Sequence, residues 1–325
     1  MSEVARIADR LLAGDRTALA RLISWAENGD PRFRAEHAVF YPRVGRARRI
    51  GITGPPGAGK STLVNELARV LREQGKTVGI LAVDPTSPIS GGALLGDRIR
   101  MEGRTLDPGV FIRSMASRDS HGGLARAAVD ACDAMDAFGF DVILLETVGV
   151  GQAEYDVVGA ADSVLVVLCP GAGDGIQAMK AGLLEVADFL VVNKCDLPGA
   201  DRLQNDLSEA VHVRFTKRAW TPPIVAVSAS TEFGIVELLQ EVEKHFTHLA
   251  SSNLVDARRE KRVQHVENVV NERLRIAIWR DHGWRAHVER ELARSISPYE
   301  VAAGVLAELS AGLADARTER GVAKS

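Results

Sequence analysis

The sequence has little cysteine, no long apolar run and no marked excess of either charge. Its 325 residues include three cysteines, Cys132, Cys169 and Cys195, which form no CxxC pair or metal-ligand spacing. So few cysteines exclude a disulfide framework and indicate a reducing compartment. Lys and Arg number 40 against 43 Asp and Glu, a formal net charge of −3. This balance argues against a protein that coats nucleic acid.

Membrane and targeting signals are also lacking. No apolar run reaches the length of a transmembrane helix, and the first residues lack the apolar stretch of a signal peptide. We therefore expect a soluble cytoplasmic protein with no membrane or nucleic-acid partner. The eight histidines are scattered, unlike the His-rich runs of metal-delivery proteins.

Short β-rich segments alternate with helical ones in the middle of the chain, which predicts βαβ units and an α/β fold with a mostly parallel central sheet flanked by helices. The expected strands are 50–53, 77–83, 142–145, 163–168, 189–192 and 224–227. An apolar stripe over residues 4–26 and another over 253–281 predict helices at both ends. The predicted parts are an N-terminal helical extension (1–45), a central domain (46–250) and a C-terminal helical extension (251–325).

A phosphate-binding loop follows the first expected strand. Its sequence is Gly54-Pro55-Pro56-Gly57-Ala58-Gly59-Lys60-Ser61, with Thr62 next on the expected helix. This GxxxxGK[ST] pattern between a strand and a helix is typical of P-loop NTPases. The glycines let main-chain N–H groups surround phosphate oxygens, Lys60 supplies a cation, and the Ser61 hydroxyl can ligate Mg²⁺.

Two further segments at strand ends predict guanine recognition. They are Asn193-Lys194-Cys195-Asp196 and Ser228-Ala229-Ser230. A carboxylate at Asp196 can accept hydrogen bonds from N1–H and the 2-amino group of guanine, whereas adenine offers neither donor, so GTP is preferred over ATP. We expect Lys194 to lie over the base and the N–H of Ala229 to bond O6.

Acidic residues at two other strand ends predict the magnesium side of the site. Asp84 ends one expected strand and can reach the metal directly or through water, and Glu146 ends another, with Gly149 placed to contact the terminal phosphate. The segment between Asp84 and Ser120 is predicted to be a long loop that covers the nucleotide.

Hydrolysis also needs a group that orients water and a cation that neutralises developing charge. Val150 follows Gly149, and Gln152 stands two positions further on. The candidate cations, besides Lys60, are Arg100 and Lys180. We therefore expect slow intrinsic hydrolysis and a partner that completes the site.

Together these motifs resemble the MeaB/ArgK/MMAA branch of the SIMIBI class of P-loop GTPases, over roughly residues 45–250. The resemblance implies a homodimeric GTPase chaperone of adenosylcobalamin-dependent methylmalonyl-CoA mutase that gates cofactor loading and protects the mutase. It implies that Ser61, Asp84, Asp97 and Glu146 surround Mg²⁺ beside GTP or GDP.

Cobalamin is expected to be carried by the partner and not by this chain. Asp119-Ser120-His121-Gly122-Gly123-Leu124 is similar to a DxHxxG cobalamin signature, but Leu124 stands where the glycine belongs. Two alternatives to a GTPase chaperone stay open: a metabolic kinase and a transport ATPase, both linked to basic amino-acid transport as ArgK-type sequences have been described.

Overall fold

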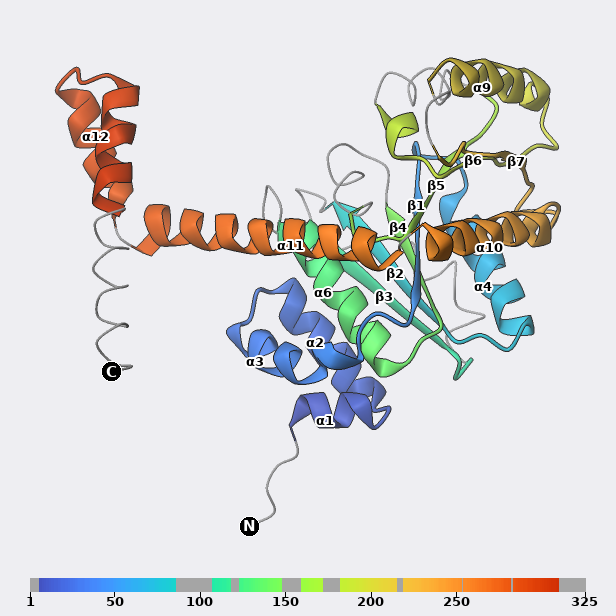
Figure 1. Ribbon diagram of the computed structural model, residues 1–325, viewed down its shortest axis with the longest axis horizontal. Coiled ribbons are helices and arrows are strands. Elements are labelled where there is room, and N and C mark those ends of the chain that lie inside the picture. The colour runs from blue at the N-terminus through green and yellow to red at the C-terminus, as the bar shows by residue number, and fades with distance from the viewer. Residues whose placement is uncertain are drawn as a thin grey trace, which may run out of the picture. The chain divides into compact units, whose positions relative to one another are not determined.

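A parallel sheet organises the first part of the chain in the computed structural model (Figure 1). The structure describes residues 6–85, 107–117, 123–147, 159–171, 182–214, 219–252, 254–281 and 283–309. Contacts divide the chain into two units, residues 1–265 and 266–325. No described helix is both long and apolar enough to cross a membrane.

The described strands form a seven-stranded sheet in the order β3-β2-β4-β1-β5-β6-β7, and neighbouring strands in it run parallel. The strands are β1 (Arg48–Thr53), β2 (Val78–Pro85), β3 (Val110–Ser117), β4 (Val142–Thr147), β5 (Ser163–Leu168), β6 (Phe189–Val192) and β7 (Ile224–Ala226). The predicted α/β fold with a parallel sheet is confirmed. Three of these strands end at the same edge of the sheet: β1, which precedes the P-loop, β4, which contains Glu146, and β6, which precedes Asn193.

Helices cover both faces of the sheet. In the first unit they are α1 (Ile7–Leu12), α2 (Arg16–Glu27), α3 (Pro31–Phe40), η1 (Tyr41–Arg43), α4 (Lys60–Glu73), α6 (Gly123–Phe138), η3 (Leu183–Val186), α9 (Ala200–Arg214) and α10 (Ile235–Ser251). One face packs against α4 and α10. The other packs against α6 with α1–α3 at one end, and against η3 and α9 at the other. Both faces are apolar because helices bury both.

Strand β3 corrects the prediction of one continuous loop between Asp84 and Ser120. It pairs with β2 from Val78↔Val110 onward, at the edge of the sheet. Its run of apolar residues is interrupted by Arg113, whose guanidinium donates to Glu27 (2.9 Å) and Ser24 (3.0 Å) on α2. The groups that bind the Arg113 guanidinium come from residues far away in the sequence. The local sequence pattern therefore did not predict the strand.

The N-terminal apolar stripe forms two helices where the sequence predicted one. Gly14 adopts φ +85° between α1 and α2. Asp15 then caps α2 by accepting from the N–H groups of Thr17 (2.8 Å) and Ala18 (3.2 Å), a favoured N-cap arrangement.

The C-terminal region is helical, as predicted. α11 (Leu254–Ile276) continues into the π-helical turn η4 (Ala277–Asp281), and α12 (Trp284–Ala293) follows. A further helix over 298–309 begins after Ser297, whose hydroxyl accepts from Glu300 N–H while Glu300 accepts from Ser297 N–H, both at 3.2 Å. This is a capping box.

Candidate functional site

The P-loop joins the end of β1 to the start of α4, and glycine is required at two of its positions. Gly54 has φ +141°, and a Cβ there would lie 2.0 Å from the main-chain oxygen of Val167 on β5. Gly59 has φ +86°, and a Cβ there would lie 2.4 Å from Nδ2 of Asn193. The loop therefore approaches two neighbouring segments too closely for any side chain. This geometry leaves its N–H groups at the N-terminus of α4, where helix dipole and free donors favour an anion.

The ammonium of Lys60 is held inside this loop. The residue is 6% exposed, and Nζ donates to the main-chain oxygens of Gly54 (2.7 Å) and Pro55 (2.9 Å). These bonds satisfy a cation that would otherwise be costly to bury. They also place a positive charge beside the loop's N–H groups, where an outer phosphate can replace the carbonyl contacts.

Ser61 and Glu146 meet next to the P-loop. The Ser61 hydroxyl donates to Oε1 of Glu146 at 2.5 Å, and Glu146 is 2% exposed at the end of β4. A hydroxyl and a carboxylate are oxygen donors of the kind that Mg²⁺ binds. The pair therefore fits the metal that the sequence motifs imply, and a bound Mg²⁺ would neutralise charge on phosphate oxygens.

A threonine pair that the sequence analysis missed lies beside these residues. The Thr147 hydroxyl at the end of β4 donates to the Thr53 hydroxyl at the end of β1 (3.0 Å), and both residues are buried. The bond ties the two strand ends that carry Glu146 and the P-loop. Polar residues at the ends of two buried strands were the available signal, but only the sheet order shows that these strands are neighbours.

Asn193 lies in one of the two segments predicted to recognise guanine, and its side chain connects the P-loop to the other. Its Nδ2 donates to the main-chain oxygens of Ala58 (2.8 Å) and Gly59 (3.4 Å), and its Oδ1 accepts from the N–H of Ala229 (3.1 Å). Asn193 is 2% exposed, so its side chain holds loops together. The Ala229 N–H, expected to bond guanine O6, is engaged by Asn193 in this structure.

Lys194 and Asp196 are placed differently from Asn193. Lys194 adopts φ +57°, which is unusual for a non-glycine residue, and its Nζ donates to the main-chain oxygen of Gly57 at 2.7 Å. Asp196 is exposed and open to a ligand. Burial, together with the Asp196 charge, raises the pKa of Cys195 between them, so this thiol stays neutral.

The second recognition segment is a short turn after β7. Ser228 N–H donates to the oxygen of Phe233 (3.0 Å), Phe233 N–H donates back (3.1 Å), and the Ser228 and Ser230 hydroxyls are 3.3 Å apart. Arg69 on α4 pairs with Glu232 in this turn at 2.9 Å. Ser230 is exposed beside the buried Ala229, so the turn presents polar groups toward solvent.

The structure thus brings together the P-loop, Glu146, Asn193–Asp196 and Ser228–Ser230. Thr62 is exposed in the first turn of α4. Asp84 is described only by its main chain in β2, opposite Ala116. The remaining predicted site residues lie outside the described ranges: Asp97, Arg100, Gly149, Gln152 and Lys180.

Comparisons with known proteins identify the relatives of this chain. The family model described as methylmalonyl Co-A mutase-associated GTPase MeaB matches residues 19–282. A Pyrococcus abyssi protein that is named as a GTPase is 43% identical over 317 residues, and the match covers 95% of this chain and 98% of the relative. The mouse mitochondrial methylmalonic aciduria type A homolog is 34% identical over 289 residues, covering 83% of this chain and 69% of the relative.

One solved structure is similar over nearly the whole length. It is that of a LAO/AO transport system kinase, with a TM-score of 0.71 and 26% identity, and the match covers 94% of this chain and 96% of the kinase. The two proteins therefore share a fold over nearly all of this chain.

Proposed function

Because the chain belongs to the MeaB family of GTPases, we propose that it is a GTP-hydrolysing chaperone of adenosylcobalamin-dependent methylmalonyl-CoA mutase. In this proposal it binds the mutase, gates cofactor loading, and protects or reactivates the enzyme. The family model, matched over residues 19–282, is the observation that carries the proposal. The mouse relative's name, which refers to methylmalonic aciduria, supports the same partner.

The chain's own residues supply most of a guanine-nucleotide site. Its P-loop N–H groups and Lys60 would bind the phosphates, and Asp196 would select guanine. Ser61 and Glu146 would hold Mg²⁺, joined by Asp84 and Asp97 in the family's ligand set. Asn193 hydrogen-bonds to both the phosphate-binding and the base-binding segments. Nucleotide binding at one segment therefore affects the position of the other.

Hydrolysis is completed by groups that the partner positions. Gln152 would orient the attacking water, and Arg100 or Lys180 would neutralise charge that develops on the phosphoryl oxygens. The expected result is a slow rate for the purified chain that rises when the mutase is added.

The test uses purified mutase and this chain together. We expect a complex on size-exclusion chromatography at about 10 µM, a GTPase rate at least about tenfold higher with the mutase, and adenosylcobalamin loading that differs between GTP and GDP. Lys60→Ala should remove the nucleotide dependence. Absence of a complex and of any rate change would refute the chaperone role and leave the GTPase activity standing.

We also propose that the chain is a homodimer. Along α11 the apolar side chains Val263, Val266, Val270 and Leu274 are 43–59% exposed, and no residue of α11 is buried. Two-fold dimers are the commonest closed assembly. Light scattering at low micromolar concentration should give twice the chain mass, and Val266→Glu with Val270→Glu should give the single mass. A wild-type chain that scatters as a monomer would refute the dimer.

The similarity to a LAO/AO transport system kinase supplies the competing hypothesis. A kinase would transfer the γ-phosphate to an acceptor and not to water. Incubation with γ-labelled GTP and arginine or ornithine separates the two, because the chaperone hypothesis expects label only in inorganic phosphate.

A further inference from the structure

A cavity of about 590 Å³ lies at the sheet edge opposite the P-loop. Arg48 begins β1, Val142 begins β4, and Lys76 precedes β2 by two residues; all three line the cavity. The same three strands end at the P-loop, Glu146 and Asp84. Six residues of strand at about 3.3 Å each separate the two edges by roughly 20 Å, so this cavity is distinct from the nucleotide site.

Basic side chains outnumber acidic ones in the lining, by four to three. It holds Arg43, Arg46, Arg48 and Lys76 against the carboxylates of Asp136, Asp141 and Glu243. Arg43 ends η1, Arg46 lies in the linker that follows, and Arg48 begins β1. The nucleotide site does not use this short basic segment.

Asp136 is already engaged by the linker's main chain. It accepts from the N–H groups of Gly45 (2.8 Å), Arg46 (3.1 Å) and Ala47 (3.0 Å), and it also pairs with Arg49 at 3.1 Å. A carboxylate with four donors has little capacity left for a further cation.

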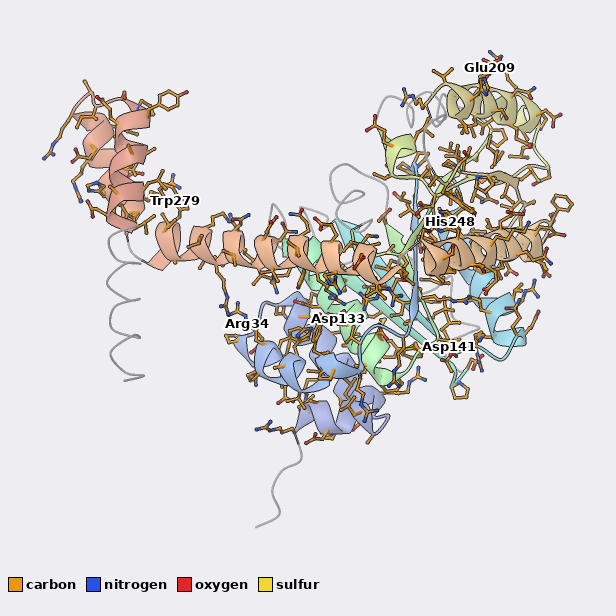
Figure 2. All side chains as sticks on the ribbon, viewed as in Figure 1. Arg34, Asp133, Asp141, Glu209, His248 and Trp279 are labelled. Carbon is orange, nitrogen blue, oxygen red and sulfur yellow. The ribbon has the colours of Figure 1, made fainter. Side chains whose placement is uncertain are left out.

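The other two carboxylates are engaged as well. Asp141 accepts from N–H and Oγ1 of Thr77, both at 2.8 Å. Glu243 binds Arg48 through both guanidinium nitrogens, with Nη2–Oε1 at 2.9 Å. Hydrogen bonding from Arg48 lowers the pKa of Glu243, which keeps that pair charged. Asp141, labelled in Figure 2, lies just before β4.

Three cations therefore remain at the rim. Arg43, Arg46 and Lys76 are exposed, and within the described ranges no carboxylate lies within ion-pair distance of them. Apolar surface lies next to them: Phe138 is stacked on Phe140 with ring centroids 5.1 Å apart and planes at 22°, and Leu12 is 38% exposed. The cavity combines a cationic rim with an aromatic wall.

We propose that this cavity is a second ligand site that binds a small organic phosphate. The phosphate would lie against Arg43, Arg46 and Lys76, because clustered guanidinium and ammonium donors match its charge and acceptor oxygens. The apolar part of the ligand would contact Phe138 and Leu12. The volume is within the range of small-molecule sites. This site is independent of the proposed chaperone role.

Isothermal titration calorimetry of the full chain saturated with GDP and Mg²⁺ tests the proposal, because GDP blocks the P-loop. With phenyl phosphate as the ligand we expect a Kd below about 1 mM, and at least about fivefold weaker binding of inorganic phosphate, which lacks the ring. Arg46→Ala with Lys76→Ala should weaken phenyl phosphate binding at least about tenfold, because two charge-assisted hydrogen bonds are lost.

Matched variants separate a site from general charge effects. Arg21→Ala with Lys244→Ala removes the same charge from exposed positions outside the cavity and should leave the Kd within about twofold. Phe138→Ala should weaken phenyl phosphate binding but not inorganic phosphate binding. The proposal is overturned if GDP saturation abolishes binding, or if the control pair weakens it as much as the cavity pair.

Discussion

Asn193→Ala tests whether one buried amide aligns the two ends of the nucleotide site. The change removes a 2.8 Å bond to Ala58, a longer 3.4 Å bond to Gly59 and a 3.1 Å bond from Ala229 N–H. The Gly59 oxygen still accepts from the N–H of Leu63 at 3.0 Å, but the Ala229 N–H and the Ala58 oxygen lose their bonds to Asn193, which is itself 2% exposed. Each buried group left unsatisfied costs about 1–3 kcal/mol.

The free energy of unfolding should therefore fall by about 2–4 kcal/mol. If half of that loss, about 1–2 kcal/mol, reflects misalignment that the bound nucleotide has to restore, GDP affinity falls by about 5- to 30-fold, since 1.4 kcal/mol is tenfold. Urea unfolding gives the first quantity, and titration with a fluorescent GDP analogue gives the second.

Asn205→Ala is the matched control, because Asn205 is exposed on α9. It should change neither quantity by more than about 0.5 kcal/mol. GDP affinity within about threefold of wild type in Asn193→Ala, with a reduced free energy of unfolding, would show that Asn193 supports the fold but does not align the site.

Three further outcomes follow from single residues. Gly54→Ala should abolish GDP binding, because its Cβ would lie 2.0 Å from Val167 O at φ +141°; retained calorimetric binding would contradict the loop geometry. Asp196→Asn should shift preference from guanine to xanthine nucleotides by at least about 100-fold; unchanged GDP and XDP affinities would remove Asp196 from base recognition. Burial and the neighbouring His248 lower the pKa of His245 to about 4, whereas the unfolded side chain titrates near 6.5. The unfolded state therefore binds the extra proton first, and the free energy of unfolding should fall by roughly 2–3 kcal/mol from pH 6.5 to 4. Urea unfolding across that range measures the slope, which His245→Phe should reduce; an equal slope in both proteins would contradict the assignment.

The sequence alone determined most of the sheet and indicated which segments are candidates for nucleotide binding. Alternation of short apolar runs with helical stripes predicted six of the strands that the structure shows, because strands buried on both faces are apolar throughout. The P-loop and the Asn193–Asp196 segment were predictable because their chemistry depends on residue types at fixed short spacings.

Tertiary structure decided what depends on residues far apart in the chain. β3 exists as a strand because β2 pairs with it and because Glu27 and Ser24 accept hydrogen bonds from Arg113. Asn193 became a link between three loops because strand order brings β1, β6 and β7 to one edge. The basic cavity arises in the same way, since Arg46 and Lys76 line one space although they lie in different segments. The local sequence determines which polar and charged side chains a segment contains. Only tertiary packing determines which of these side chains come into contact.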